Sequence, residues 1–274
     1  MTYKTLMAQI SVGKSNGELL RITSDLAARH DARIVGIAAC QPMPLAYGDG
    51  YPSGAAIVDC QNQLKAELRN AEAEFREALK DSKAKLEWRS DYTTEALPYY
   101  LASEARCADL IIASVGGASA FDTSRHTSLG DLVIRAGRPI LVVPDTGAST
   151  PFNRIVVAWK DTREARRAAV AALPMLALAS HVTVLEVADE PDMPAARGRG
   201  EDVANWLAEH GIAAVSSAVA SSGDNFDQIG ALLNEHAAEL VVAGAYGHSR
   251  LREWAFGGVT RGLLKGGRCA LLAH

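Results

Sequence analysis

Short apolar runs alternate along the chain with longer segments whose apolar residues recur at helical spacing. The short runs predict buried strands over residues 5–10, 33–39, 86–92, 109–113, 139–143, 154–158, 182–187, 212–220, 239–243 and 269–273,. The longer segments predict helices over residues 17–30, 57–80, 94–106, from about 128, 162–177, 201–210 and 225–236,. Strands that alternate with helices indicate an α/β fold, with parallel sheets covered on both faces.

The same order of elements occurs twice. The segment PDTGASTP at 144–151 has no periodic pattern and is rich in turn-forming residues, so we interpret it as a linker,. The strand segment CADLIIA at 107–113 matches AAELVVA at 237–243. We therefore predict two similar domains, at residues 1–146 and 152–274. Each half ends in an apolar strand, and because an open apolar edge invites pairing, we expect internal pairing and a homodimer.

The composition is typical of a soluble globular protein, with 48% hydrophobic and 22% charged residues,. A formal net charge of -4 gives no strong attraction to nucleic acid or to an anionic membrane,. No apolar run reaches the ~20 residues of a membrane-spanning helix, and the first residues do not have the pattern of a signal peptide. Four cysteines without CxxC spacing favour structural thiols in a reducing compartment, so we expect a cytoplasmic protein,.

A glycine-rich segment, GAYGHSRLREWAFGGVT at 244–260, follows the predicted strand 239–243. Gly244 and Gly247 allow positive φ angles and a close approach of the backbone to a ligand. Gly257 and Gly258 leave amide N–H groups open where a helix is expected to begin, which suits a phosphate group. A turn that needs glycine only for its shape is the alternative interpretation of this segment.

The spacing of these glycines, G-x2-G-x9-G from Gly244 to Gly257, resembles the nucleotide loop of the universal stress protein family. Because both halves share one pattern, the chain looks like a tandem member of that family. The resemblance implies two doubly wound domains, each a five-stranded parallel sheet in the order 3-2-1-4-5 flanked by helices. It also implies a homodimer, and ATP or a related adenine nucleotide as ligand, with Mg²⁺ as the ion that would accompany it.

The resemblance places the nucleotide-binding residues in the second half. They are Ala158, Trp159, Lys160, Asp161, Val187, Gly244, Gly247, His248, Gly257, Gly258, Val259 and Thr260. The loop residues would hold the ribose and the phosphates, and Val187 would lie near the base. His248 would either meet phosphate oxygens or face solvent.

This chain departs from the family pattern at two positions of the second half. Lys160 stands where the family has an acidic residue that contacts the nucleoside, and Gly258 stands where Ser or Thr is usual. Asp161 could replace the acidic residue after a shift of one position, or Lys160 could approach a phosphate as a point charge. Both could equally be solvated loop charges.

The first half departs further from the pattern. Ser11 stands at the acidic position and Ser114 replaces the first glycine. The loop between Gly117 and Gly130 is also longer than the family's nine residues. Since a cradle of backbone amides depends on loop length, we interpret this half as non-binding or altered.

No catalytic or metal-binding pattern is present in the sequence. The chain has no G-x-S-x-G elbow, no phosphate loop ending in GK[ST], and no His in metal-ligand spacing with Cys, Asp or Glu,. Any ATP hydrolysis is therefore expected to be slow. Two functions stay open: a regulatory stress-response protein that binds an adenine nucleotide in its second half, and a nucleotide-free scaffold that acts through unidentified protein partners.

Overall fold

The computed structural model describes residues 2–42, 54–114, 124–145, 147–223, 225–245 and 268–274. The strands are β1 (Thr5–Gln9), β2 (Arg33–Cys40), β3 (Leu86–Tyr92), β4 (Leu110–Ser114), β5 (Ile140–Val143), β6 (Arg154–Ala158), β7 (His181–Ala188), β8 (Ala214–Ala220), β9 (Leu240–Gly244) and β10 (Cys269–Ala273). The helices are α1 (Gly17–His30), α2 (Gly54–Ala78), α3 (Leu97–Glu104), α4 (Leu129–Ala136), α5 (Arg163–Leu176), α6 (Met193–Glu209) and α7 (Asn225–Glu235), with short 3-10 helices η1 (Ala105–Cys107) and η2 (Glu190–Asp192). Each predicted strand overlaps an observed one.

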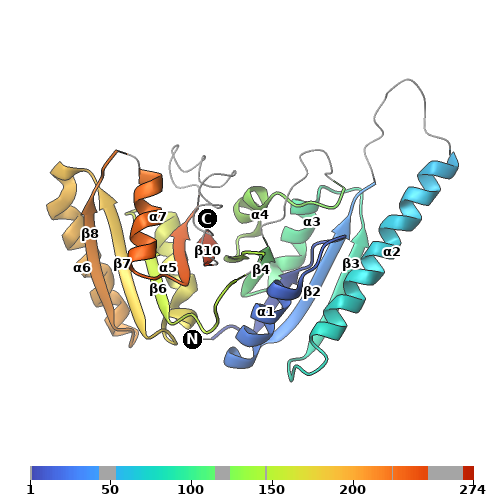
Figure 1. The fold of residues 1–274 in the computed structure, drawn as a ribbon, viewed down its shortest axis with the longest axis horizontal. Helices are drawn as coiled ribbons and strands as arrows, with labels where there is room; N and C mark the ends of the chain where they lie inside the picture. Colours follow the sequence, from blue (N-terminus) through green and yellow to red (C-terminus); the bar gives the residue numbers. More distant parts are fainter. Residues whose placement is uncertain (1, 43–53, 115–123, 146, 224, 246–267) are drawn as a thin grey trace.

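The strands form one sheet in the order β3-β2-β1-β4-β5-β10-β9-β6-β7-β8 (Figure 1). Neighbours are parallel within the first five strands and within the last five, and the two sets meet where β5 and β10 pair antiparallel. The two apolar edge strands pair within the chain, as expected, and so join the two sets into one continuous sheet. The reason is the apolar edge of each set: Leu141 and Leu271 pair in register, and both are fully buried. Because β5 and β10 cover each other, neither is an open edge for a homodimer.

The core also crosses from one half to the other. On one face of the sheet a single apolar cluster packs under α1, α2, α5 and α6. On the opposite face α3 and α4 cover one cluster, and α7 covers another. Tyr3, which precedes β1, is buried and donates a hydrogen bond of 2.6 Å to the carbonyl of Ala171 in α5. The first strand is thus tied directly to a helix of the second half.

Helix α6 begins at Met193, well before the predicted start at residue 201. Gly198 and Gly200 lower the helical propensity of this segment, which is why the sequence pattern suggested a later start. In the structure Gly200 faces β8, and a Cβ atom added to it would lie 3.1 Å from Cβ of Ser216. The missing side chain lets α6 lie close to β8, so packing outweighs the cost of glycine in the helix.

Candidate functional site

The candidate site lies at the carboxyl ends of β6, β7 and β9. Strand β6 lies between β9 and β7, and Ala158 pairs in register with Ala243 on one side and Leu185 on the other. The Trp159 amide extends this pairing by donating to the Leu185 carbonyl at 2.7 Å. From β6 the chain continues to β7, which lies on one side of β6, whereas the later strand β9 lies on the other side. The strand order therefore changes direction at β6, which makes this place a switch point. Ligands of open α/β sheets bind at such points.

The structure brings half of the predicted nucleotide-binding residues together at this edge. Residues 158–161 follow along β6 and its end, Val187 lies near the end of β7, and Gly244 ends β9. The remaining predicted residues lie outside the described part of the chain: Gly247, His248, Gly257, Gly258, Val259 and Thr260.

Gly244 is required for a different reason from the one we expected. A Cβ atom at this position would lie 2.4 Å from the Ala165 amide nitrogen and 2.6 Å from the Glu164 carbonyl carbon. Its φ angle is not in the left-handed region. The glycine therefore allows the first turn of α5 to pack directly on β9, and this contact, not a positive φ, explains its presence.

Glu164, in the first turn of α5, is a buried acidic residue that the sequence analysis missed. Burial alone would raise the pKa of its carboxyl group. Hydrogen bonds from its own backbone N–H and from Arg163, together with the charges of Arg163 and His274, outweigh burial and lower that pKa. The signal was present in the sequence, because an acidic residue soon after the N-cap Thr162 is typical of a helix start.

The two charged residues that follow β6 are both exposed. Asp161 forms an ion pair with Arg166 of α5. Lys160 has no ion pair among the residues that the structure describes, and its carbonyl accepts a 2.6 Å hydrogen bond from the Thr162 amide. Asp161 is thus held toward the helix, whereas the Lys160 ammonium is available at the edge of the sheet.

Trp159 is half-buried and packs against the core cluster that extends across both halves. Its indole Nε1 is buried and has no acceptor among the described residues. Buried indole N–H groups usually have a hydrogen-bond partner. This donor at the end of β6 is therefore a group that a ligand or a water could satisfy.

At the matching place in the first half, protein side chains contact one another. Ser11 lies two residues after β1, as Lys160 does after β6, and Ser114 ends β4, as Gly244 ends β9. The Ser11 and Ser114 hydroxyl oxygens lie 3.2 Å apart, within hydrogen-bond distance. The Asn16 side-chain amide donates to the Ser11 carbonyl at 3.1 Å and to Glu74 Oε2 at 2.8 Å.

An ion pair borders the same place. Arg125 Nε donates to Glu67 Oε2 at 2.6 Å, and both side chains are largely buried. Gly13 lies next to this pair, because a Cβ atom there would be 3.7 Å from Glu67 Oε2. These contacts join residues that are far apart in the sequence, so no local pattern indicated them.

Within the described ranges, no group of three or more His, Cys, Asp or Glu residues could hold a metal ion. None of the described helices combines the length and the apolar character needed to cross a membrane.

A comparison with known protein families gives a match in the second half of the chain. Residues 151–273 match the universal stress protein family. The match spans β6 to β10 and so includes the whole candidate site. None of the curated proteins compared matches the chain.

Solved structures extend the likeness of fold to the full chain. A universal stress protein from Archaeoglobus fulgidus DSM 4304 has a TM-score of 0.75 at 12% identity, covering 98% of this chain and 95% of that one. A protein of unknown function from Pseudomonas aeruginosa PAO1 has a TM-score of 0.58 at 15% identity, covering 99% and 92%. A shorter universal stress protein from Archaeoglobus fulgidus, solved in complex with dAMP, has a TM-score of 0.33 at 16% identity over 52% of this chain and 98% of its own. The two longer matches show a shared fold that includes the first half.

Proposed function

We propose that this chain is a cytoplasmic stress-response protein that binds ATP or a related adenine nucleotide in its second half and acts through nucleotide occupancy. The observation that carries the proposal is the position of the glycine-rich segment. It follows Gly244 directly at the switch point between β6 and β9, within the residues that match the universal stress protein family. A glycine-rich turn at that place can present several backbone N–H groups to phosphate oxygens.

We infer that the chain consists of two stress-protein-like domains, at residues 1–146 and 152–274. The two strand sets support this inference, because each follows the order third, second, first, fourth, fifth when counted from its own first strand. Equivalent main-chain contacts support it too. The Ile10 amide donates to Ile37 at 2.8 Å, as the Trp159 amide donates to Leu185.

The second half offers groups that suit an anionic nucleotide. The exposed Lys160 ammonium can approach a phosphate as a point charge,. The Trp159 indole N–H is a hydrogen-bond donor beside it, and Val187 supplies apolar surface near the end of β7. In our proposal residues 244–260 hold the ribose and the phosphates, and Mg²⁺ enters with the nucleotide. No described residue is placed as a general base for water, so hydrolysis is expected to be slow.

The first half is proposed not to bind nucleotide. The Ser11–Ser114 contact and the Asn16–Glu74 hydrogen bonds occupy the place that a nucleoside would need. A ligand would have to displace hydrogen bonds that are already made, including those to the Glu74 carboxylate. Bonds to a charged group contribute roughly 1.5–3 kcal/mol each, so entry of a ligand is unfavourable.

A scaffold that binds no nucleotide is the second candidate function. The specific observation in its favour is the charge pattern near α5. A lysine replaces the acidic residue expected at position 160, and the buried Glu164 carboxylate already occupies its own helix N-terminus. Such a protein would act only through protein partners.

Calorimetric titration with ATP and Mg²⁺ separates the two candidates. We expect the native chain to bind one nucleotide, the Gly257→Asp variant to bind none, and the matched Gly130→Asp variant to bind one. The substitution at Gly257 adds volume and negative charge beside the expected phosphates, whereas Gly130 is a buried residue of α4 in the other half. Thermal unfolding of both variants checks that they fold. No binding by the native chain would establish the scaffold instead.

A further inference from the structure

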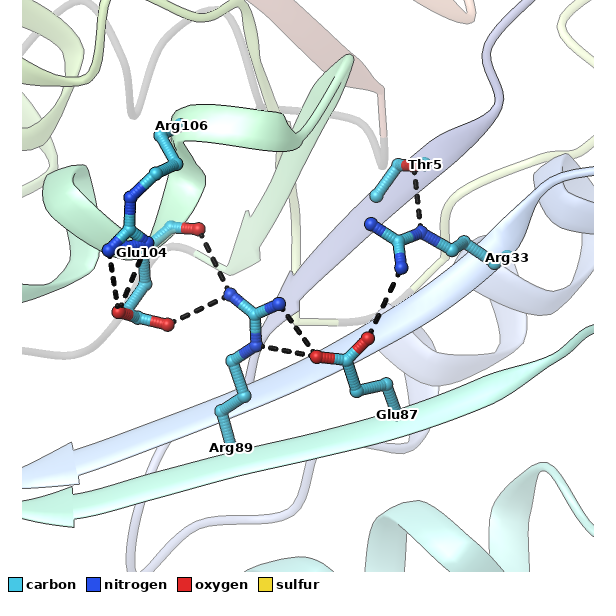
Figure 2. A network of polar contacts seen from close by, with 6 residues as sticks. All are labelled: Thr5, Arg33, Glu87, Arg89, Glu104 and Arg106. Carbon is cyan, nitrogen blue, oxygen red and sulfur yellow. Dashed lines mark hydrogen bonds and ion pairs between the residues drawn. The ribbon is translucent and has the colours of Figure 1, made fainter.

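The two ends of the ten-stranded sheet differ in charge. Strand β3 forms one edge and β8 the other (Figure 1). On β3, Glu87 and Arg89 form a network of ion pairs with Arg33 and Glu104 (Figure 2). Arg89 Nη2 lies 2.6 Å from Glu87 Oε1, and Arg89 Nη1 lies 2.8 Å from Glu104 Oε2. Charged side chains on an edge strand discourage pairing with another chain.

Strand β8 has none of these charges. Strand β8 begins opposite the second residue of β7, and β3 likewise begins opposite the second residue of β2. Val215 is therefore equivalent in position to Glu87, and Ser217 is equivalent to Arg89. The whole strand reads AVSSAVA. Val215 is 70% exposed. It borders a hollow of about 640 Å³ on the sheet face, whose lining includes His181, Thr183 and Ser217.

The main-chain groups of β8 divide between β7 and the open edge. The Ser221 amide donates to the Ala188 carbonyl of β7 at 2.7 Å. Because successive residues of a strand point their N–H and C=O groups to opposite sides, the odd-numbered residues of β8 bond to β7. Residues 214, 216, 218 and 220 therefore direct both groups outward. Among the described elements, β8 pairs only with β7.

The sequence of β8 is nearly the same in both directions. When it is reversed about Ser217, Val215 exchanges with Val219 and Ala214 with Ala220. In an antiparallel pair with a two-fold axis at Ser217, residues 214 and 216 of one copy would face 220 and 218 of the other. These four facing pairs all consist of outward-directed residues, and each pair exchanges two hydrogen bonds, giving about eight in total.

We infer that β8 is a self-association edge, which pairs antiparallel with β8 of a second copy of this chain about an axis through Ser217. The exposed Val215 of one copy then lies against the partner's Val219. In each chain Val219 already packs beside the core cluster under α7. An antiparallel pair of edge strands also joins the two strand sets in the middle of the sheet, where β5 pairs with β10. This inference does not depend on nucleotide binding.

The sequence of β8 favours a second copy of the same strand over an unrelated strand as its partner. Each apolar side chain on the open face of β8 finds an apolar side chain opposite it in this register, and no charge is opposed. The same operation on β3, about Arg89, would set two arginines opposite each other and Glu87 opposite Asp91. Like charges directly opposite on antiparallel strands are destabilising. Only the β8 end of the sheet is therefore compatible with its own copy.

Analytical ultracentrifugation of the full chain, at concentrations up to about 100 µM, tests the inference. The native protein should sediment as a dimer of 29.1 kDa chains. Ser217→Lys and Ser217→Glu each place like charges opposite each other at the axis. Each should weaken self-association by about tenfold or more. An equal mixture of the two variants sets Lys opposite Glu and should restore the dimer.

Ser90→Lys, on the other edge strand, is the matched control and should leave the dimer unchanged. Circular dichroism and thermal unfolding confirm that the variants keep the native fold. A monomeric native protein overturns the inference, as does a Ser217→Lys variant that still dimerises like the native chain. A mixture that stays monomeric overturns the proposed register, because the two substituted residues then do not face each other.

Discussion

Gly244→Ala should destabilise the protein although alanine is the smallest possible change. The added Cβ atom would lie 2.4 Å from the Ala165 amide nitrogen, and ordinary contacts of a Cβ atom begin at 3.4 Å. The first turn of α5 must therefore retreat from β9 by about 1 Å, the difference between the two distances. Overpacking of this kind typically costs about 1–3 kcal/mol. We expect the upper part of that range, because the atoms that clash are backbone atoms and cannot rotate away.

One effect acts in the opposite direction. Alanine restricts the unfolded chain more than glycine does, which stabilises a protein by about 0.4–1 kcal/mol where the native conformation tolerates it. Gly198→Ala, on the exposed side of α6, isolates this effect, because a Cβ atom there meets nothing within 4 Å. We expect the control to be neutral or stabilised by about 0.5–1 kcal/mol. The difference between the two variants measures the clash at Gly244.

Urea unfolding followed by tryptophan fluorescence provides both free energies of unfolding. The midpoint for Gly244→Ala should fall with an unchanged slope against urea, since the native state remains compact. A Gly244→Ala variant as stable as the native protein would refute the reasoning. It would show that α5 can move away from β9 at little cost, and that Gly244 is present for some other purpose.

Two further predictions concern the contacts around Tyr3. Tyr3→Phe removes the 2.6 Å hydrogen bond to Ala171 and should lower the free energy of unfolding by about 0.5–1.5 kcal/mol in urea titrations,; an unchanged value would show that this contact does not stabilise the junction of the halves. His30 packs edge-on against Tyr3, and burial, with the charges of Arg29 and Lys4, lowers its pKa below the ordinary 6.5. The folded state thus binds this proton more weakly than the unfolded state. Its contribution to stability is complete above about pH 6.5 and is lost as the pH falls below that value. His30→Gln should flatten the fall in urea midpoint between about pH 7 and about pH 5, and an equally steep fall in the variant would exclude His30 as its source.

Much of the fold could be predicted from the sequence because strands buried on both faces appear as continuous apolar runs. Every described strand was found in this way. The start of α6 was missed because Gly198 and Gly200 reduce helical propensity, and only the distance from Gly200 to Ser216 shows why glycine is favoured there. Local pattern carries no information about such a contact between distant segments.

The apolar edge strands led us to expect both pairing within the chain and a homodimer, without assigning a partner to each strand. An apolar edge strand indicates that pairing will occur, but not whether its partner lies in the same chain or in another. The register of Leu141 with Leu271 settles this for β5 and β10. The sequence pattern also does not distinguish the edge strand β8 from the other strands, because its significance depends on its position at the end of the sheet.

The sequence predicted which strands border the candidate site, but not how the side chains around it are arranged. The glycine spacing and the strand order placed it at the ends of β6 and β9. The pairing of Asp161 with Arg166, the burial of Glu164 and the clash behind Gly244 depend on how α5 lies against β9. The Asn16–Glu74 contact at the matching place of the first half joins a loop to α2, so its two residues are far apart in the sequence.

The number of nucleotides bound per chain tests the central claim most directly. Native mass spectrometry of the intact protein, titrated with ATP and Mg²⁺, measures this number from the added mass on each 29.1 kDa chain. We predict one nucleotide per chain at saturation, because the polar contacts of Ser11, Ser114 and Asn16 close the first half. Two nucleotides per chain would contradict the assignment of the site to the second half alone, and none would contradict nucleotide binding itself.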